Sequence, residues 1–84
     1  MNNKFILESL ASDLKRVALG LHRGSNNMAI RFLNEALRRK NELYVEEIPP
    51  YIQKLLNKLN KNINADDALM YSTLIQNYSQ HKKI

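Results

Sequence analysis

The sequence predicts an all-α fold, a small single-domain bundle of about four helices over residues 1–84. Three observations favour this class. Apolar residues recur at three- and four-residue intervals, turn-forming residues separate these segments, and no stretch alternates as a strand would. A chain this short buries only about 60% of its unfolded surface. Its core is therefore limited, and we expect association with another copy or another protein to supplement it.

The first two helices are expected over about residues 4–22 and 26–44. Gly24 suits the position after a helix end, where a left-handed backbone is often needed, and Ser25 suits the cap of the second helix. The two helices should form an antiparallel hairpin. The apolar stripe of the first follows a 3-4-3-4 spacing: Leu7, Leu10, Leu14, Val17 and Leu21.

A third helix is expected over about residues 50–61, after a proline connector. Pro49 disfavours helix at the residue before it, whereas Pro50 can occupy the first turn of the next helix. The apolar residues of this segment lie on one side: Tyr51, Ile52, Leu55, Leu56 and Leu59.

The fourth helix is expected over about residues 65–80. Asn64 can cap it, and Asp66 and Asp67 in its first turn complement the positive end of the helix dipole. Its apolar stripe comprises Met70, Tyr71, Leu74, Ile75 and Tyr78.

The residue types that carry catalysis or bind metals are scarce. There is no cysteine, and His22 and His81 lie far apart without ligand spacing. No Gly-rich phosphate loop, HExxH or G-x-S-x-G occurs. The adjacent carboxylates at positions 46–47 and 66–67 do not form a shared-proton pair, because neighbouring side chains on a helix point about 100° apart. We expect no enzymatic activity, no cofactor, no metal and no small-molecule substrate.

The apolar runs are short. The first has three residues, at positions 5–7, which is too few for the core of a signal peptide. No run approaches the roughly 20 residues of a membrane span. We therefore expect a soluble, cytoplasmic protein that makes no use of a membrane.

The positive charge is concentrated in the first two helices. From Lys15 to Lys40 there are seven basic residues and one acid, Glu35, in a chain whose formal charge is +5. This asymmetry favours an acidic partner, and arginine forks match phosphate geometry. The alternative is a solvated polar face whose arginine stems cover apolar surface. The predicted contacts to phosphate or an acidic partner are Arg16, Arg23, Ser25, Asn27, Arg31, Arg38 and Arg39.

Several charges of the second helix are spaced for ion pairs. Glu35 lies four residues from both Arg31 and Arg39, and Arg38 lies four residues before Glu42. Residues at this spacing are neighbours on a helix surface. We therefore expect Glu35 to pair with Arg31 or Arg39, and Arg38 to pair with Glu42.

The stretch HRGSNN, residues 22–27, is either a simple joint or a seat for an anion. Gly24 and Ser25 are explained by one helix ending and the next beginning, with no ligand required. The free N–H groups that start the second helix, with Arg23 and Arg31 nearby, would form the anion seat. We favour the simple joint.

The apolar arc of the second helix is wide enough to contact more than one neighbour. Aromatic residues on such stripes usually belong to a core or an interface, although base stacking is an alternative. We expect a non-enzymatic interaction module that forms a homo-oligomer or docks on another protein. The alternative is a nucleic-acid-binding protein that uses the arginine-rich ridge. The predicted protein interface comprises Phe32, Leu37, Tyr44, Tyr71 and Tyr78.

Overall fold

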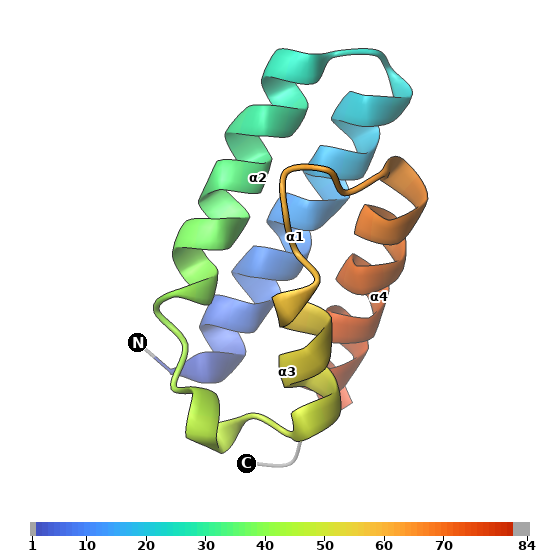
Figure 1. Ribbon diagram of the computed structural model, residues 1–84. Helices are drawn as coiled ribbons and strands as arrows, with labels where there is room; N and C mark the ends of the chain where they lie inside the picture. Colours follow the sequence, from blue (N-terminus) through green and yellow to red (C-terminus); the bar gives the residue numbers. More distant parts are fainter. Residues whose placement is uncertain (1, 82–84) are drawn as a thin grey trace.

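The structure, a computed structural model, describes residues 2–81 and forms a bundle of four α-helices. These are α1 (Asn3–His22), α2 (Asn26–Lys40), α3 (Pro50–Asn57) and α4 (Ala65–His81), with a short 3-10 helix, η1 (Val45–Glu47), before α3. The described residues contain no strand. α1 and α2 form an antiparallel hairpin, while α4 packs along α1 and α3 lies in front of it (Figure 1). The predicted all-α bundle is confirmed.

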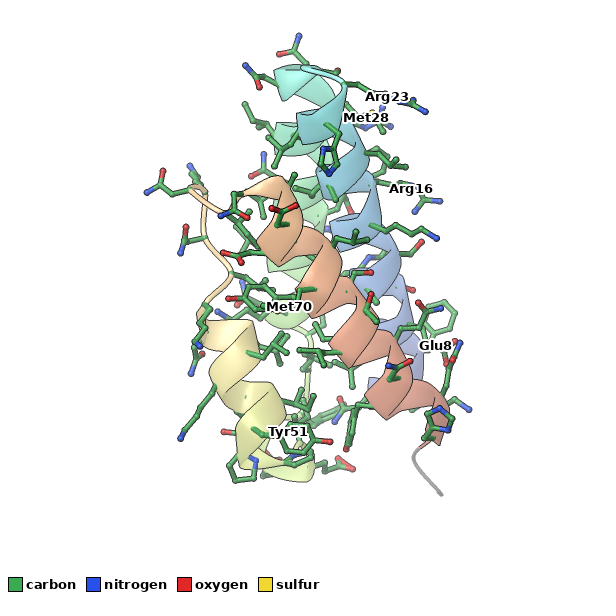
Figure 2. The ribbon with its side chains drawn as sticks, turned by 90° about the vertical axis from the view of Figure 1, so that its right-hand side faces the viewer. Glu8, Arg16, Arg23, Met28, Tyr51 and Met70 are labelled. Carbon is green, nitrogen blue, oxygen red and sulfur yellow. The ribbon has the colours of Figure 1, made fainter. Side chains whose placement is uncertain are left out.

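α1 is the central helix, because both α2 and α4 pack along it. Ala18 packs with residues of both neighbours, where its small side chain lets the helices come close. Glu8, Arg16 and Arg23 lie along one exposed edge of α1 (Figure 2). The side chains of the predicted apolar stripe that are almost completely buried are Leu7, Leu10, Leu14 and Val17.

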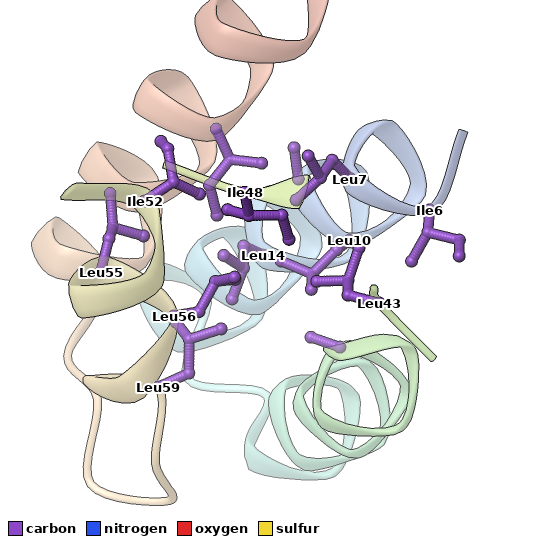
Figure 3. Packing of buried hydrophobic residues seen from close by; sticks show 13 residues of the cluster. Ile6, Leu7, Leu10, Leu14, Leu43, Ile48, Ile52, Leu55, Leu56 and Leu59 are labelled. Atoms are coloured by element: carbon purple, nitrogen blue, oxygen red, sulfur yellow. The ribbon is translucent and has the colours of Figure 1, made fainter. Parts of the chain in front are cut away.

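The core consists of two clusters of apolar side chains. The larger one joins α1 to α3, α4 and the connector before α3 (Figure 3). The smaller one lies near the α1–α2 joint and contains Val17, Ala18, Ala29, Leu33 and Ala68. Burial of this surface is the main contribution that holds the helices together. Residues at the centre of the larger cluster include Leu10, Leu14, Ile48, Ile52 and Leu56.

A buried hydrogen bond fixes α4 against α1. The Ser72 hydroxyl, on α4, donates to the Ala11 carbonyl oxygen, on α1, at 2.7 Å. Ser72 is 3% exposed, so this bond satisfies a hydroxyl that would otherwise lose its contact with water. Over residues 2–81, no helix combines the length and the apolar character that crossing a membrane requires.

The close approach of α1 and α2 depends on Gly20. A Cβ atom at this position would lie 2.9 Å from the Ala29 backbone nitrogen and 3.2 Å from the Ser25 carbonyl oxygen. Real Cβ atoms do not approach backbone atoms to 2.9 Å, so any side chain would push the helices apart. The absence of a side chain at Gly20 therefore sets the spacing of the hairpin near its joint.

α2 ends at Lys40, four residues before the predicted end of the 26–44 segment. The reason is a contact distant in sequence. The Asn3 side chain donates to the Tyr44 carbonyl oxygen at 3.0 Å and accepts from the Tyr44 N–H at 2.9 Å. Because Asn3 takes both backbone groups of Tyr44, the chain leaves the helix, and Leu43 turns into the core.

α3 ends at Asn57, four residues before the predicted end of the 50–61 segment. Asn60 forms a local turn in which its side-chain oxygen accepts from the Asn62 N–H at 2.8 Å. Its amide group also donates to the Lys58 carbonyl oxygen at 3.1 Å. Asparagine competes with helix through local bonds of this kind. Pro50 does occupy the first turn of α3, as predicted.

Candidate functional site

The joint between α1 and α2 is explained by backbone geometry. Gly24 has a φ of 72°, the left-handed conformation predicted from the sequence. The Ser25 N–H donates to the Gly20 carbonyl oxygen at 2.8 Å, which closes the end of α1. Ser25 stands at the N-cap of α2, but its hydroxyl makes no capping bond. Asn27 is exposed in the first turn of α2.

Three of the seven predicted phosphate contacts pair with acidic side chains, and two of them, Arg38 and Arg39, do so closely. The Arg39 Nε donates to Asp13 Oδ2, on α1, at 2.8 Å, and the Asp13 side chain is 7% exposed. Arg38 pairs with Glu35 and, at 3.7 Å, with Glu42. The predicted pairing of Arg38 with Glu42 is confirmed, whereas Glu35 pairs with Arg38 and not with Arg31 or Arg39. Both arginines are thus largely neutralised.

The Glu35–Arg38 pair also shifts the ionisation of its members. A hydrogen bond from Arg38, and then its charge, lowers the pKa of Glu35 below the ordinary glutamate value. The same bond and charge raise the pKa of Arg38. Opposite charges favour each other's ionised forms in this way. The pair is therefore ionised throughout the neutral range.

Two exposed arginines flank one aromatic ring, and a third exposed arginine, Arg23, follows the end of α1. The guanidinium carbons of Arg16 and Arg31 lie 5.4 Å and 5.6 Å from the centre of the Phe32 ring. Both distances are typical of cation–π contacts. Arg23, the residue that follows α1, is exposed, and among residues 2–81 no acidic side chain pairs with it or with Arg31. We call Arg16, Arg23, Arg31 and Phe32 the arginine surface.

Arg16 is partly engaged within its own helix. Its Nη1 donates to the Ser12 hydroxyl oxygen at 2.9 Å and lies 4.0 Å from Asp13 Oδ1. Asp13 is already bonded to Arg39 at a shorter distance. Arg16 therefore stays about half exposed, since its side chain is 49% accessible. Of the five arginines predicted to form a ridge, Arg38 and Arg39 make the closer contacts with carboxylates.

The five residues of the predicted protein interface do not share one surface. Phe32 lies under the arginines of the arginine surface. Leu37, Tyr71 and Tyr78 are half-buried against the core. Tyr44 is exposed and lies just before η1. Only Tyr71 and Tyr78 border a common hollow surface, which lies between α3 and α4.

That hollow surface is an apolar groove along α3 and α4. It consists of two adjoining hollows of about 420 Å³ and 320 Å³, and Tyr51 and Leu74 line both. Three large apolar side chains stand open to solvent in it: Tyr51 is 63% exposed, Met70 48% and Leu74 46%. Tyr51 and Met70 lie on the α3 side of the molecule, away from Arg16 and Arg23 (Figure 2). We call this feature the α3–α4 groove.

The wall of the groove is partly fixed by an aromatic pair. The rings of Tyr51 and Tyr78 meet edge to face, with their centres 6.1 Å apart and an interplanar angle of 89°. This is a favoured arrangement of aromatic rings. Tyr51, on α3, is thereby held against α4 although most of its surface is exposed.

Lysines border the groove along α3. Lys54 and Lys58 line the hollow that contains Met70, and both are exposed. They are four residues apart, and Lys58, the residue that follows α3, keeps a helical backbone conformation, so the two lysines lie on the same side. No aspartate or glutamate lines either hollow. The groove therefore combines an apolar floor with a positively charged rim.

Sequence reasoning assigned Met70 and Leu74 to the buried stripe of the fourth helix. The structure instead buries Ile75 and half-buries Tyr71 and Tyr78, while Met70 and Leu74 stay exposed. A signal for this was present in the sequence, because two adjacent apolar rows make a stripe too wide for one neighbouring helix. The groove follows from that excess width.

The remaining chemistry-bearing side chains do not converge. Over residues 2–81, no three histidine, cysteine, aspartate or glutamate side chains are placed to hold a metal ion. Comparison with protein-family models, curated proteins and solved structures gave no match. The candidate functional surfaces are thus the α3–α4 groove and the arginine surface.

Proposed function

We propose that this chain is a non-enzymatic interaction module that docks a protein partner in the α3–α4 groove. The observation that carries the proposal is the exposure of Tyr51, Met70 and Leu74 side by side in one hollow surface. Contiguous exposed apolar surface with a polar rim is typical of interaction sites. Tyrosine and methionine are also enriched at protein interfaces.

The shape of the groove favours a protein partner over a small molecule. Small-molecule sites enclose most of their ligand. Here the lining side chains of Tyr51, Met70 and Leu74 are about half exposed, so the groove is broad and open. A surface of this kind gains most of its contact area from an extended partner such as a helix.

The distribution of ionisable groups supports a role without catalysis. Asp13, the carboxylate that lies most deeply in the described structure, is bonded to Arg39. The groove itself is lined by apolar side chains and lysines, with His81 at one end. A general acid or base needs a partner and a reacting atom within hydrogen-bond reach. The groove brings no such pair together.

Nucleic-acid binding is the second candidate function, and one observation favours it. On the arginine surface, two guanidinium groups flank an aromatic ring, and Arg23 and Arg31 lack acidic partners among the described residues. Such groups bind phosphates and stack on bases. The pairing of Arg38 and Arg39 with acids weakens this candidate relative to the groove.

Site-specific photo-crosslinking in cells that express the protein tests the proposal. A photoreactive amino acid is placed at Leu74, in the groove, and at Leu19, an exposed leucine of α1 outside it. We expect discrete protein adducts from position 74 and none from position 19. An adduct of twice the chain mass would identify a second copy as the partner, and other masses would identify a different protein. Equal adduct yields at the two positions, or none at either, would overturn the proposal.

A further inference from the structure

We infer that the partner of the α3–α4 groove is an amphipathic helix with acidic residues beside its apolar stripe, held by Lys54 and Lys58. This inference rests on the proposed function and specifies its partner. It combines three features of the groove: its length, its adaptable apolar lining and its one-sided charge.

The groove has the length of a short docked helix. Its lining along α4 runs from Met70 to His81, a distance of about 16 Å at 1.5 Å per helical residue. Three turns of a partner helix have this length. Helices that dock in grooves present apolar anchors at positions i, i+3 or i+4, and i+7, which are spread over such a distance.

The lining is suited to side chains of varied shape. Met70 is flexible and polarisable, so it can adjust to different apolar anchors. Leu74 lies in both hollows, midway along the groove. Tyr51 also lines both hollows and forms a firmer wall, because its ring packs on Tyr78. A partner's apolar stripe would therefore contact Leu74 and Tyr51 at its centre and Met70 toward one end.

The positive charges of Lys54 and Lys58 at the rim of the groove favour acidic residues on the partner. Lys54 and Lys58 are one helical turn apart, and no carboxylate lines the groove. A docked helix with glutamate or aspartate at i and i+4, beside its apolar stripe, would place one acid near each ammonium group. A helix with lysine or arginine at those positions would be repelled.

The same charges disfavour a second copy of this chain as the occupant. In a two-fold symmetric contact, each copy presents the same patch to the other. Here that patch carries Lys54 and Lys58 and no carboxylate, so neither copy could neutralise the other's lysines. Nucleic acid is disfavoured too, because the groove offers apolar surface and only two lysines to the phosphate backbone.

Selection from a displayed library of amphipathic helices tests this inference. The library has a fixed apolar stripe and randomised flanking positions, and it is selected against the full chain. Binders are then tested against two variants of the chain, Leu74→Glu in the groove and Leu19→Glu as the matched control. Groove binders are those that lose binding to the first variant and keep it to the second. We expect groove binders to carry several-fold more Asp and Glu than Lys and Arg at the flanking positions. Circular dichroism checks that both variants remain folded.

Charge reversal provides the decisive comparison. Selection against the double variant Lys54→Glu/Lys58→Glu should enrich basic flanks instead, and acidic binders from the first selection should bind it about tenfold more weakly. Groove binders without charge preference would overturn the acidic-helix inference, while crosslinking at position 74 would still support the interaction module. Failure to select any binder sensitive to Leu74→Glu would also overturn it.

Discussion

The Arg39 Nε donates to Asp13 Oδ2 at 2.8 Å, which joins α2 to α1 through a largely buried ion pair. The pair has two consequences. It removes Arg39 from the basic surface, and it leaves Asp13 dependent on Arg39 for its charge balance. A charge that loses its partner in a buried site is strongly destabilising.

We therefore expect Arg39→Ala to destabilise the protein by about 2–3 kcal/mol, less than for a fully buried pair because the Arg39 side chain is 26% exposed. Asp13→Leu combined with Arg39→Met should recover most of this loss, since it leaves no unpaired charge. Urea unfolding measures both. Arg38→Ala, in the exposed network, is the control and should change the midpoint little. Equal midpoints for the two single variants would contradict the structural role of Arg39.

Gly20→Ala should destabilise the hairpin although alanine favours helix. Helix propensity alone predicts a gain of about 1 kcal/mol. The new Cβ would meet the Ala29 backbone nitrogen at 2.9 Å, and displacing α2 should cost up to about 3 kcal/mol, which exceeds that gain. Thermal unfolding measures the sign. A stabilised variant would show that the two helices can separate at no cost.

Gly24→Ala should also destabilise, but through the backbone. Gly24 has a φ of 72°, and nothing lies within 4 Å of an added Cβ. The cost is then the left-handed conformation alone, about 1–2 kcal/mol. Gly24→Asn should cost less, since asparagine tolerates this conformation. If the alanine and asparagine variants unfold at the same temperature, backbone strain is not the cause.

These two glycines show what the sequence could and could not predict. Gly24 follows an amphipathic segment and precedes a capping residue, so local pattern was sufficient for its conformation. Gly20 lies inside the first helix, and its importance arises from Ala29, nine residues later. The helix ends at Lys40 and Asn57 were missed for related reasons. Asn3 acts on Tyr44 across 41 residues, and Asn60 forms a turn within an apparently helical stretch.

The candidate site follows the same division. The sequence located the arginines correctly on α1 and α2, but Asp13, three turns before the joint, decides which one is neutralised. Similarly, the apolar stripe of α4 was visible in the sequence, but not which of its two rows is buried: Ile75 is buried, whereas Met70 and Leu74 stay uncovered. Periodicity gives the faces of helices, whereas exposure depends on the length and position of their neighbours.

Substitution of two N-cap residues should have unequal effects. The Asp67 N–H donates to Asn64 Oδ1 at 2.7 Å, so Asn64→Ala should cost about 0.5–2 kcal/mol. Ser25 occupies the same position before α2 but its hydroxyl makes no capping bond, so Ser25→Ala should cost clearly less. Chemical unfolding of both variants gives the comparison. A larger loss for Ser25→Ala would mean that its hydroxyl caps α2 in solution.

The pKa of Glu35 should report the state of its ion pair with Arg38. Because the pKa is lowered in the folded protein, the pair stabilises the fold above the ordinary glutamate pKa of about 4.3. That contribution is lost as the pH falls through the lowered value. NMR titration should place Glu35 below about 4.3, and Arg38→Gln should raise its pKa toward that value. A Glu35 pKa that does not respond to Arg38→Gln would assign the shift to another cause.

Nucleic-acid binding by the arginine surface would have a quantitative salt signature. With three exposed arginines, the logarithm of the affinity for duplex DNA should fall against the logarithm of salt with a slope of about −3. Arg23→Ala and Arg31→Ala should each reduce the slope by about one. Arg39→Met should leave it unchanged, because Arg39 is bonded to Asp13. Fluorescence titrations at low and moderate salt measure these slopes.

The control for this titration is a variant in the α3–α4 groove, Leu74→Glu. Leu74 lies in the α3–α4 groove and not on the arginine surface. The variant should therefore abolish docking of a helix and leave DNA binding unaffected. If the protein binds neither DNA nor RNA at low salt, the arginine surface is a solvated face in which Arg16 and Arg31 pack on Phe32. If Arg39→Met weakens binding as much as Arg31→Ala does, the ion pair with Asp13 opens on contact with phosphate. The salt slope distinguishes these cases, because only a released guanidinium adds to it.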